Sequence, residues 1–362
     1  MSRPSWTTVT PVAALVVLGL TWGSHPGVVA AAGIGVFLVG AVLSAVHHAE
    51  VVAHRVGEPF GSLLLAVAVT VIEVGLIVSL MVGSEGDTSA LARDTVFAAA
   101  MITVNGIAGL ALVIGAVKYR MAVFNPEGAG SALTTVVALA ALTLVLPRFT
   151  TSEPGPEFSS SQLAFAAVAS LALYGIFVFT QTVRHRDFFL PVDDGRGPAD
   201  EDGDGHADPP DDRAALASLV LLLLGLVAVV GLAKVESYPI QDGVAAVGFP
   251  ESFVGVVIAL VVLLPESIAA ARAAARNRVQ TSLNLAYGSA MASIGLTIPV
   301  IAVASIWLDG PLVLGLEPMQ MVLLVVSVIT AVLTVVPGRA KTLHGLVHLV
   351  LLAAFVFLSI KP

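Results

Sequence analysis

Long apolar runs alternate with short polar breaks along the whole chain. A helix needs about 20 consecutive apolar residues to cross the hydrocarbon core of a bilayer. Eleven runs of about this length can be marked between the polar breaks. The pattern therefore predicts eleven membrane-spanning helices near residues 8–24, 27–48, 59–82, 94–117, 130–147, 161–182, 214–234, 249–271, 282–307, 312–336 and 341–360.

The composition excludes a water-soluble domain. Hydrophobic residues make up 57% of the chain and charged residues only 12%, which is too few polar side chains to cover a soluble surface. The fold class is therefore an all-α polytopic membrane protein whose partner is the lipid bilayer. With no cysteine, disulfides and thiolate metal sites are excluded. The net charge of -8 argues against a nucleic-acid partner, and no cofactor is expected.

Basic residues predict the orientation of the chain in the membrane. Of the 17 Lys and Arg residues, 13 fall in connections on one side of the predicted spans and 4 on the other. Because cytoplasmic loops carry the excess of Lys and Arg, the N-terminus is predicted to be cytoplasmic and the C-terminus external.

One long polar segment divides the spans. Residues 184–213 are rich in Asp, Gly and Pro, a composition typical of a disordered linker. It is interpreted as a solvated cytoplasmic tether, with a calcium sensor or a cation-attracting antenna as the alternative. The predicted organisation is an extra N-terminal helix (1–26), a first five-helix repeat (27–183), the linker (184–213) and a second five-helix repeat (214–362).

Two glutamates stand inside two of the most apolar spans, at corresponding positions of the two halves. Sliding one half over the other by 193 residues aligns Glu58 with Glu251 and Glu73 with Glu266. Under the predicted topology these spans cross the membrane in opposite directions. Two halves of opposite orientation are typical of secondary transporters, whose substrates bind near the bilayer midplane.

A carboxylate at mid-membrane depth is costly, at about 2.5 to 3.5 kcal/mol even on the lenient scale. The structural alternative is that each glutamate is protonated and hydrogen-bonded between helices. If Glu73 and Glu266 converge, their charge of -2 is neutralised by one divalent cation or by two protons, and burial makes protonation near neutral pH feasible. Such a site predicts exchange of the cation for protons.

Neutral oxygens complete a site for a hard cation. Pro265, next to Glu266, predicts a helix break that frees backbone carbonyls. The following span of each half supplies amide and hydroxyl candidates, although close helix packing is an equal explanation for the hydroxyls. These candidates are Thr103, Asn105, Ser289 and Ser293.

Histidines form two clusters. His47, Glu50 and His54 share one helical face at the cytoplasmic end of the second span, where they indicate either a pH sensor or metal-access site or an interfacial polar cap. His344 and His348 are interpreted as packing or hydrogen-bonding residues of the last span.

Three stretches resemble the calcium/cation antiporter superfamily, specifically the bacterial ChaA-type members of its cation/proton exchanger branch. They are "HHAEVVAHRVGEPFGSLLLAVAVTVIEVGLIVSLM" (47–81), "FPESFVGVVIALVVLLPESIAAA" (249–271) and "NLAYGSAMASIGLTIP" (284–299). The resemblance implies an inner-membrane antiporter of calcium, sodium or potassium against protons.

Residue by residue, the resemblance implies that Glu73 and Glu266 are the central cation ligands. Asn105 and Ser289 match the family's polar partners, and Glu58 and Glu251 match acidic residues that help to load and gate the cation. The chain departs from the related calcium exchangers at Ala292, which stands about where a glutamine is usual, and in "TVIE" before the first glutamate. These departures weaken the case for selectivity toward calcium alone.

The function predicted from the sequence is a secondary cation/proton antiporter that exports a cation from the cytoplasm. Two alternatives from other classes are a cation channel, which conducts without protons, and a membrane-embedded metal hydrolase built on the histidine clusters.

Overall fold

The computed structural model describes residues 5–57, 60–83, 87–192, 210–307 and 310–362, and these residues are almost entirely helical. The chain forms two compact units, residues 1–91 with 208–262 and residues 92–207 with 263–362. Each predicted half contributes to both units: its first spans belong to unit 1 and its later spans to unit 2. The compact units therefore differ from the sequence halves.

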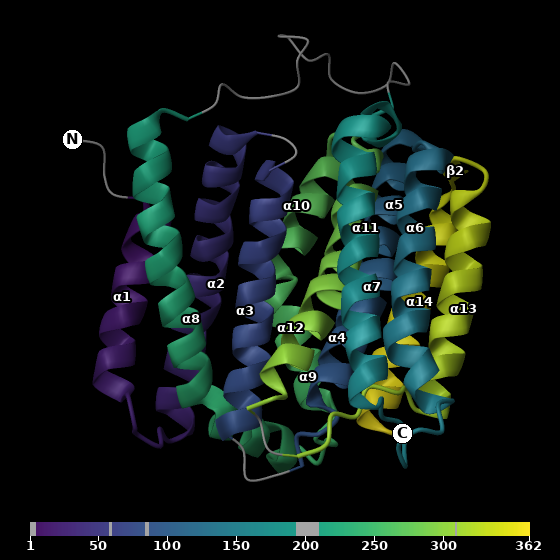
Figure 1. Ribbon diagram of the computed structural model, residues 1–362. Helices are drawn as coiled ribbons and strands as arrows, with labels where there is room; N and C mark the ends of the chain where they lie inside the picture. The colour runs from purple at the N-terminus through teal and green to yellow at the C-terminus, as the bar shows by residue number, and fades with distance from the viewer. Residues whose placement is uncertain (1–4, 58–59, 84–86, 193–209, 308–309) are drawn as a thin grey trace. The chain divides into compact units, whose positions relative to one another are not determined.

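Unit 1 is a helical bundle with an apolar core. It contains α1 (Trp6–Thr21), α2 (Val28–Val56), α3 (Phe60–Gly83), α8 (Asp212–Ala246) and α9 (Phe253–Val262). The helices α1, α2, α3 and α8 lie side by side (Figure 1), and α9 packs against α3. Small residues allow the close approach of α2 and α8, since a Cβ added to Gly225 would lie 3.2 Å from Cβ of Ala45.

Unit 2 holds the remaining elements. They are α4 (Leu91–Met101), η1 (Ile102–Ile107), α5 (Ala108–Tyr119), β1 (Ala122–Val123), α6 (Pro126–Ala140), η2 (Ala141–Val145), η3 (Leu146–Arg148), α7 (Ser160–Phe179), η4 (Thr180–Arg184), η5 (Arg186–Phe189), α10 (Leu264–Ala275), α11 (Val279–Ala292), η6 (Ser293–Thr297), α12 (Ile298–Ala304), α13 (Pro318–Val335), β2 (Arg339–Ala340) and α14 (Thr342–Ile360).

Short backbone pairings tie the loops of unit 2 together. The strands β1 and β2 pair antiparallel, with Ala122 opposite Ala340 and Val123 opposite Arg339. A separate bridge joins Glu157 to Val313. The pairings join loops of the first half to loops of the second half.

The number of spans agrees closely with the expectation. In the described part of the chain, nine helices are long and apolar enough to cross a membrane, and α9 with α10 passes the same test as an interrupted pair. The eleventh expected span corresponds to α1, an apolar helix of 16 residues. The count of eleven stays a prediction.

Two boundaries were wrong. The seventh span was expected to end at residue 234, but α8 continues to Ala246, with Glu236 buried and Pro239 inside the helix. The predicted linker was expected to start at residue 184, but the chain remains ordered beyond it. Phe189 is buried there, and its carbonyl accepts a hydrogen bond from Asn284 Nδ2 at 2.6 Å. Residues 193–209 of that linker lie outside the described residues.

Candidate cation site

Glu73 lies in the middle of the continuous helix α3 of unit 1 and is only 3% exposed. The flanking sequence is apolar on both sides, so that nothing in the local pattern interrupts the helix. Burying a carboxyl group this deeply carries a substantial desolvation cost. A chain that keeps such a residue in the membrane is expected to use it for function.

Thr70 stands one turn before Glu73 and was missed from the sequence. Hydroxyls in this protein usually donate to the carbonyl four residues earlier, as Thr103 Oγ1 does to the Ala99 carbonyl at 2.7 Å. Thr70 is 5% exposed, and its Oγ1 has no hydrogen-bond partner among the described residues. Because residues three apart share a helical face, Thr70 and Glu73 lie on the same side of α3. The signal was present in "TVIE" as a hydroxyl three residues before the glutamate.

Glu266 has a different local structure from Glu73. The helix α9 ends at Val262, Leu263 is not helical (φ -86°, ψ 0°), and α10 begins at Leu264 with Pro265 and Glu266 in its first turn. The predicted break at Pro265 is therefore confirmed. The carboxylate lies in the first turn of α10, where exposed backbone N–H groups and the helix dipole favour negative charge.

Unit 2 brings the helix of Glu266 together with the elements that carry its expected partners. The helix α10 packs against η1 and against α11. Thr103 and Asn105 lie in η1, Ser289 is half-buried in α11, and Ser293 begins η6. Both η1 and η6 are π-helical, a departure from α-helix that occurs often at functional sites.

Asn105 belongs to a buried hydrogen-bond network that the sequence did not reveal. Its Nδ2 donates to Ser327 Oγ at 2.8 Å, and its Oδ1 accepts from His348 Nδ1 at 3.0 Å. His348 Nε2 lies 3.3 Å from Thr334 Oγ1. Asn105 and His348 are both fully buried. The network fixes the amide toward α13 and α14 and leaves one lone pair of Oδ1 for a further ligand.

The hydrogen-bonding interpretation of the last-span histidines is confirmed. His348 takes part in the network above, and His344 Nδ1 accepts a hydrogen bond from the backbone N–H of Lys341 at 3.1 Å. His348 carries its proton on Nδ1 because the Asn105 oxygen can only accept.

The cluster predicted on α2 is spread over exposed and half-buried positions of that helix. His47 and Glu50 are exposed and His54 is half-buried, and among the described residues no three His, Asp or Glu side chains are grouped to hold a metal. Their neighbour His48 is 4% exposed, and its Nε2 lies 3.0 Å from the Thr7 carbonyl. His48 therefore fastens α2 to α1, while the alternatives for His47, Glu50 and His54 stay predictions.

The two outer glutamates were predicted to load and gate the cation. Glu251 is exposed in the turn before α9, where an ion arriving from solvent can reach it. Glu58 lies outside the described residues.

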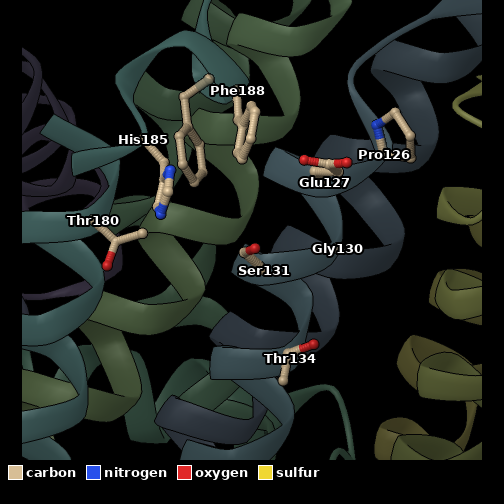
Figure 2. Close-up of a pocket in the computed structure, with 9 residues that line it drawn as sticks. Pro126, Glu127, Gly130, Ser131, Thr134, Thr180, His185 and Phe188 are labelled. Carbon is tan, nitrogen blue, oxygen red and sulfur yellow. The ribbon is translucent and has the colours of Figure 1, made fainter. Parts of the chain in front are cut away.

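An open cavity of about 650 Å³ lies in unit 2, apart from the expected ligands. Figure 2 shows Glu127, Ser131 and Thr134 along α6 facing Thr180 and His185, which come from the end of the α7 span. The ring of His185 stacks on Phe188 at a centroid distance of 5.3 Å. None of the predicted site residues lines this cavity.

Comparison with known proteins identifies the family. The model of the family described as "Sodium/calcium exchanger protein" matches residues 26–183 and 217–361. The chain belongs to this family. The bounds of the two matched stretches lie within a few residues of the predicted halves, 27–183 and 214–362, and the inverted repeat stays a prediction.

Two relatives that align over most of their length are named as ion transporters. The chain is 47% identical over 326 residues to a putative ionic transporter, y4hA, of Sinorhizobium fredii, covering 90% of this chain and 87% of the relative. It is 35% identical over 350 residues to the sodium-potassium/proton antiporter ChaA of Escherichia coli, covering 95% and 93%.

Solved structures share the fold. Native YfkE superposes with a TM-score of 0.73 at 17% identity, covering 99% of both chains. The H⁺/Ca²⁺ exchanger CAX gives 0.70 at 15% identity, covering 98% of this chain and 91% of that one. These structures show the fold. The family match and the 35% identity to ChaA show that the chain is a multi-pass membrane transporter of an antiporter family, so the hydrolase alternative is wrong.

Proposed function

We propose that the protein exports a cation from the cytoplasm in exchange for protons, by alternating access to one site built on Glu73 and Glu266. The observation that carries the proposal is the pair of carboxyl groups at matching positions of the two halves. Each is followed by a span whose π-helical segment bears hydroxyl or amide groups. Membership of an exchanger family supports this function and opposes a channel, which does not couple its ion to protons.

Charge explains the coupling. The empty site carries two negative charges, and moving a doubly charged site through hydrocarbon is too costly to occur at a useful rate. A divalent cation or two protons neutralise it, so only the loaded forms reorient. A monovalent cation neutralises half of the charge and would need a proton beside it.

We propose the following ligands for the cation. The carboxylates of Glu73 and Glu266 supply the charge, and Thr70 Oγ1 supplies a neutral oxygen in unit 1. In unit 2 the neutral oxygens come from Asn105 and Ser289, with Thr103 and Ser293 in supporting positions. Oxygen ligands of this kind suit calcium, sodium and potassium. The relative from Escherichia coli is named for sodium and potassium, and the structural relative CAX for calcium, so all three ions are candidates here.

Proton flux in proteoliposomes tests the proposal. Vesicles with an acidic lumen receive calcium, sodium, potassium or magnesium outside while an entrapped dye reports lumenal pH. The wild type is expected to alkalinise the lumen with at least one cation, and Glu73→Gln and Glu266→Gln are expected to abolish the response.

The matched control is Glu153→Gln, which removes an exposed carboxylate in the loop before α7 and should leave the flux unchanged. Absence of proton movement with every cation, or full flux in both site variants, would refute the proposal.

A further inference from the structure

Glu236 is a buried acidic residue that the proposed cation site does not use. It lies in α8 and is 5% exposed. Its Oε1 is buried without a hydrogen-bond partner among the residues that the structure describes, where no ion pair involves it either. A buried polar atom without a partner costs about 1 to 3 kcal/mol, so a residue kept only for packing would be replaced by an apolar one at no loss.

The helix register shows what Glu236 faces. The helices α2 and α8 run antiparallel, since Arg55 at the end of α2 bonds Asp212 at the start of α8. They touch at Ala45 and Gly225. Moving 11 residues from this contact in the same direction along both helices leads to Ile34 and Glu236. Because 11 residues complete about three turns, both side chains remain on the facing surfaces.

The seam between α2 and α8 at this level is apolar. On α2, the residues spaced along the facing stripe are buried at 4% exposure or less, and they are Ile34, Leu38, Ala41 and Ala45. Glu236 therefore lies in the α2–α8 seam, defined here by these four residues and the facing surface of α8. Under the predicted topology, this part of the seam is at the external side of the membrane.

Other titratable groups near this level are few, and two of them, Lys234 and His25, contact aromatic rings. The ammonium of Lys234 lies 5.4 Å from the centroid of the Trp22 ring, and the ring of His25 packs on Tyr238 at 5.4 Å. Asp242 is exposed. The helices α1 and α9 and residues 28–46 of α2 contain no ionisable side chain, and the described residues of α3 contain only Glu73.

We propose that Glu236 is a proton-binding switch that holds the external end of the α2–α8 seam closed when protonated and opens it to water when ionised. The physical reason is the difference in solvation between the two forms. A neutral carboxyl group is tolerated between apolar surfaces, whereas a carboxylate requires water or a cation. The ligand is the proton itself, and its binding makes the exchange sensitive to external pH. Only this effect on exchange depends on the proposed function.

Single cysteines report the state of the seam directly, because the chain has none of its own. Ile34→Cys places a thiol in the seam, and Val28→Cys places one at an 87% exposed position of the same helix. The labelling rate with a water-soluble maleimide is measured from neutral to alkaline pH, in the full-length protein in vesicles. Dividing the Ile34→Cys rate by the Val28→Cys rate removes the effect of pH on the thiol itself.

The ratio of rates is expected to rise about tenfold with pH when Glu236 is present, as its carboxylate ionises, and to stay flat in Glu236→Gln. Asp242→Asn, which removes an exposed carboxylate of the same helix, should behave like the parent. A ratio that stays flat in the parent, or that rises equally in Glu236→Gln, would overturn the proposal.

Transport provides the second readout. With lumenal pH fixed, Glu236→Gln should remove the dependence of the exchange rate on external pH while retaining exchange itself. Retention of the full pH dependence in Glu236→Gln would count against the switch. If the unmodified protein exchanged no cation, the proposed function would fail, and the cysteine ratio would still decide the role of Glu236.

Discussion

A glycine crossing between α5 and α14 controls the geometry of the Asn105 network. A Cβ added to Gly345 would lie 2.7 Å from the Gly109 carbonyl oxygen, 2.7 Å from Val113 Cγ2 and 2.8 Å from the Val113 backbone nitrogen. Two of these atoms are backbone and cannot move aside. Normal contacts between non-bonded heavy atoms require about 3.5 to 4.0 Å, so Gly345→Ala has to push the two helices apart.

The magnitude has three parts. Overpacking costs about 1 to 3 kcal/mol. Separation of the helices also weakens the bond between His348 Nδ1 and Asn105 Oδ1, now 3.0 Å, which contributes about 0.5 to 1.5 kcal/mol. Replacing glycine by alanine inside a helix returns about 1 kcal/mol. The net expectation for Gly345→Ala is a loss of about 0.5 to 3.5 kcal/mol in the free energy of unfolding.

Gly175→Ala is the matched control. Gly175 lies in α7 of the same unit, and a Cβ there meets nothing within 4 Å. This variant gains the higher helix propensity of alanine without a steric clash, so it should be as stable as the parent or more stable. Thermal unfolding in detergent compares the two, and equal melting temperatures for Gly345→Ala and Gly175→Ala would refute the argument from close packing.

Three further predictions follow from single contacts. Thr70→Val should leave thermal stability unchanged or raised, because the lost hydroxyl has no partner in the described residues. The same variant should raise the KM for the cation in flux assays. A stability loss without a KM change would contradict the role of Thr70 as a ligand. Gly75→Ala should lower the free energy of unfolding by about 1 to 3 kcal/mol, because the added Cβ would lie 2.5 Å from Val230 Cγ2. Adding Val230→Ala removes this clash, so the double variant should melt at a higher temperature than Gly75→Ala alone. Arg93→Met should destabilise by about 3 to 5 kcal/mol in denaturation experiments, because Asp94 then loses its buried partner at 2.9 Å, and adding Asp94→Leu should recover most of the loss.

The sequence predicted the features that depend on local pattern. Hydropathy indicated the spans, Pro265 the break between α9 and α10, and the regular spacing of Glu73 and Glu266 the transporter class. These features depend on interactions within one helix or on the burial of apolar side chains in the membrane. Both can be inferred from the order of residues along the chain.

Features that depend on contacts between distant segments were not predicted. Asn105 and His348 are 243 residues apart, and nothing in either span signals their bond. The seventh predicted span ended at residue 234, which left Glu236 outside it. Only packing against α2 shows that this segment is buried helix. The separation of each half between two compact units is likewise a property of packing, which no local pattern encodes.

The central claim is that a cation and protons compete for one site that needs both glutamates. Calorimetric titration of the purified protein with the transported cation, repeated in buffers of different ionisation enthalpy, measures the protons released per cation bound. We expect release of about two protons per divalent cation in the wild type and loss of that release in both Glu73→Gln and Glu266→Gln. Cation binding without proton release, or the same release in either variant, would contradict it.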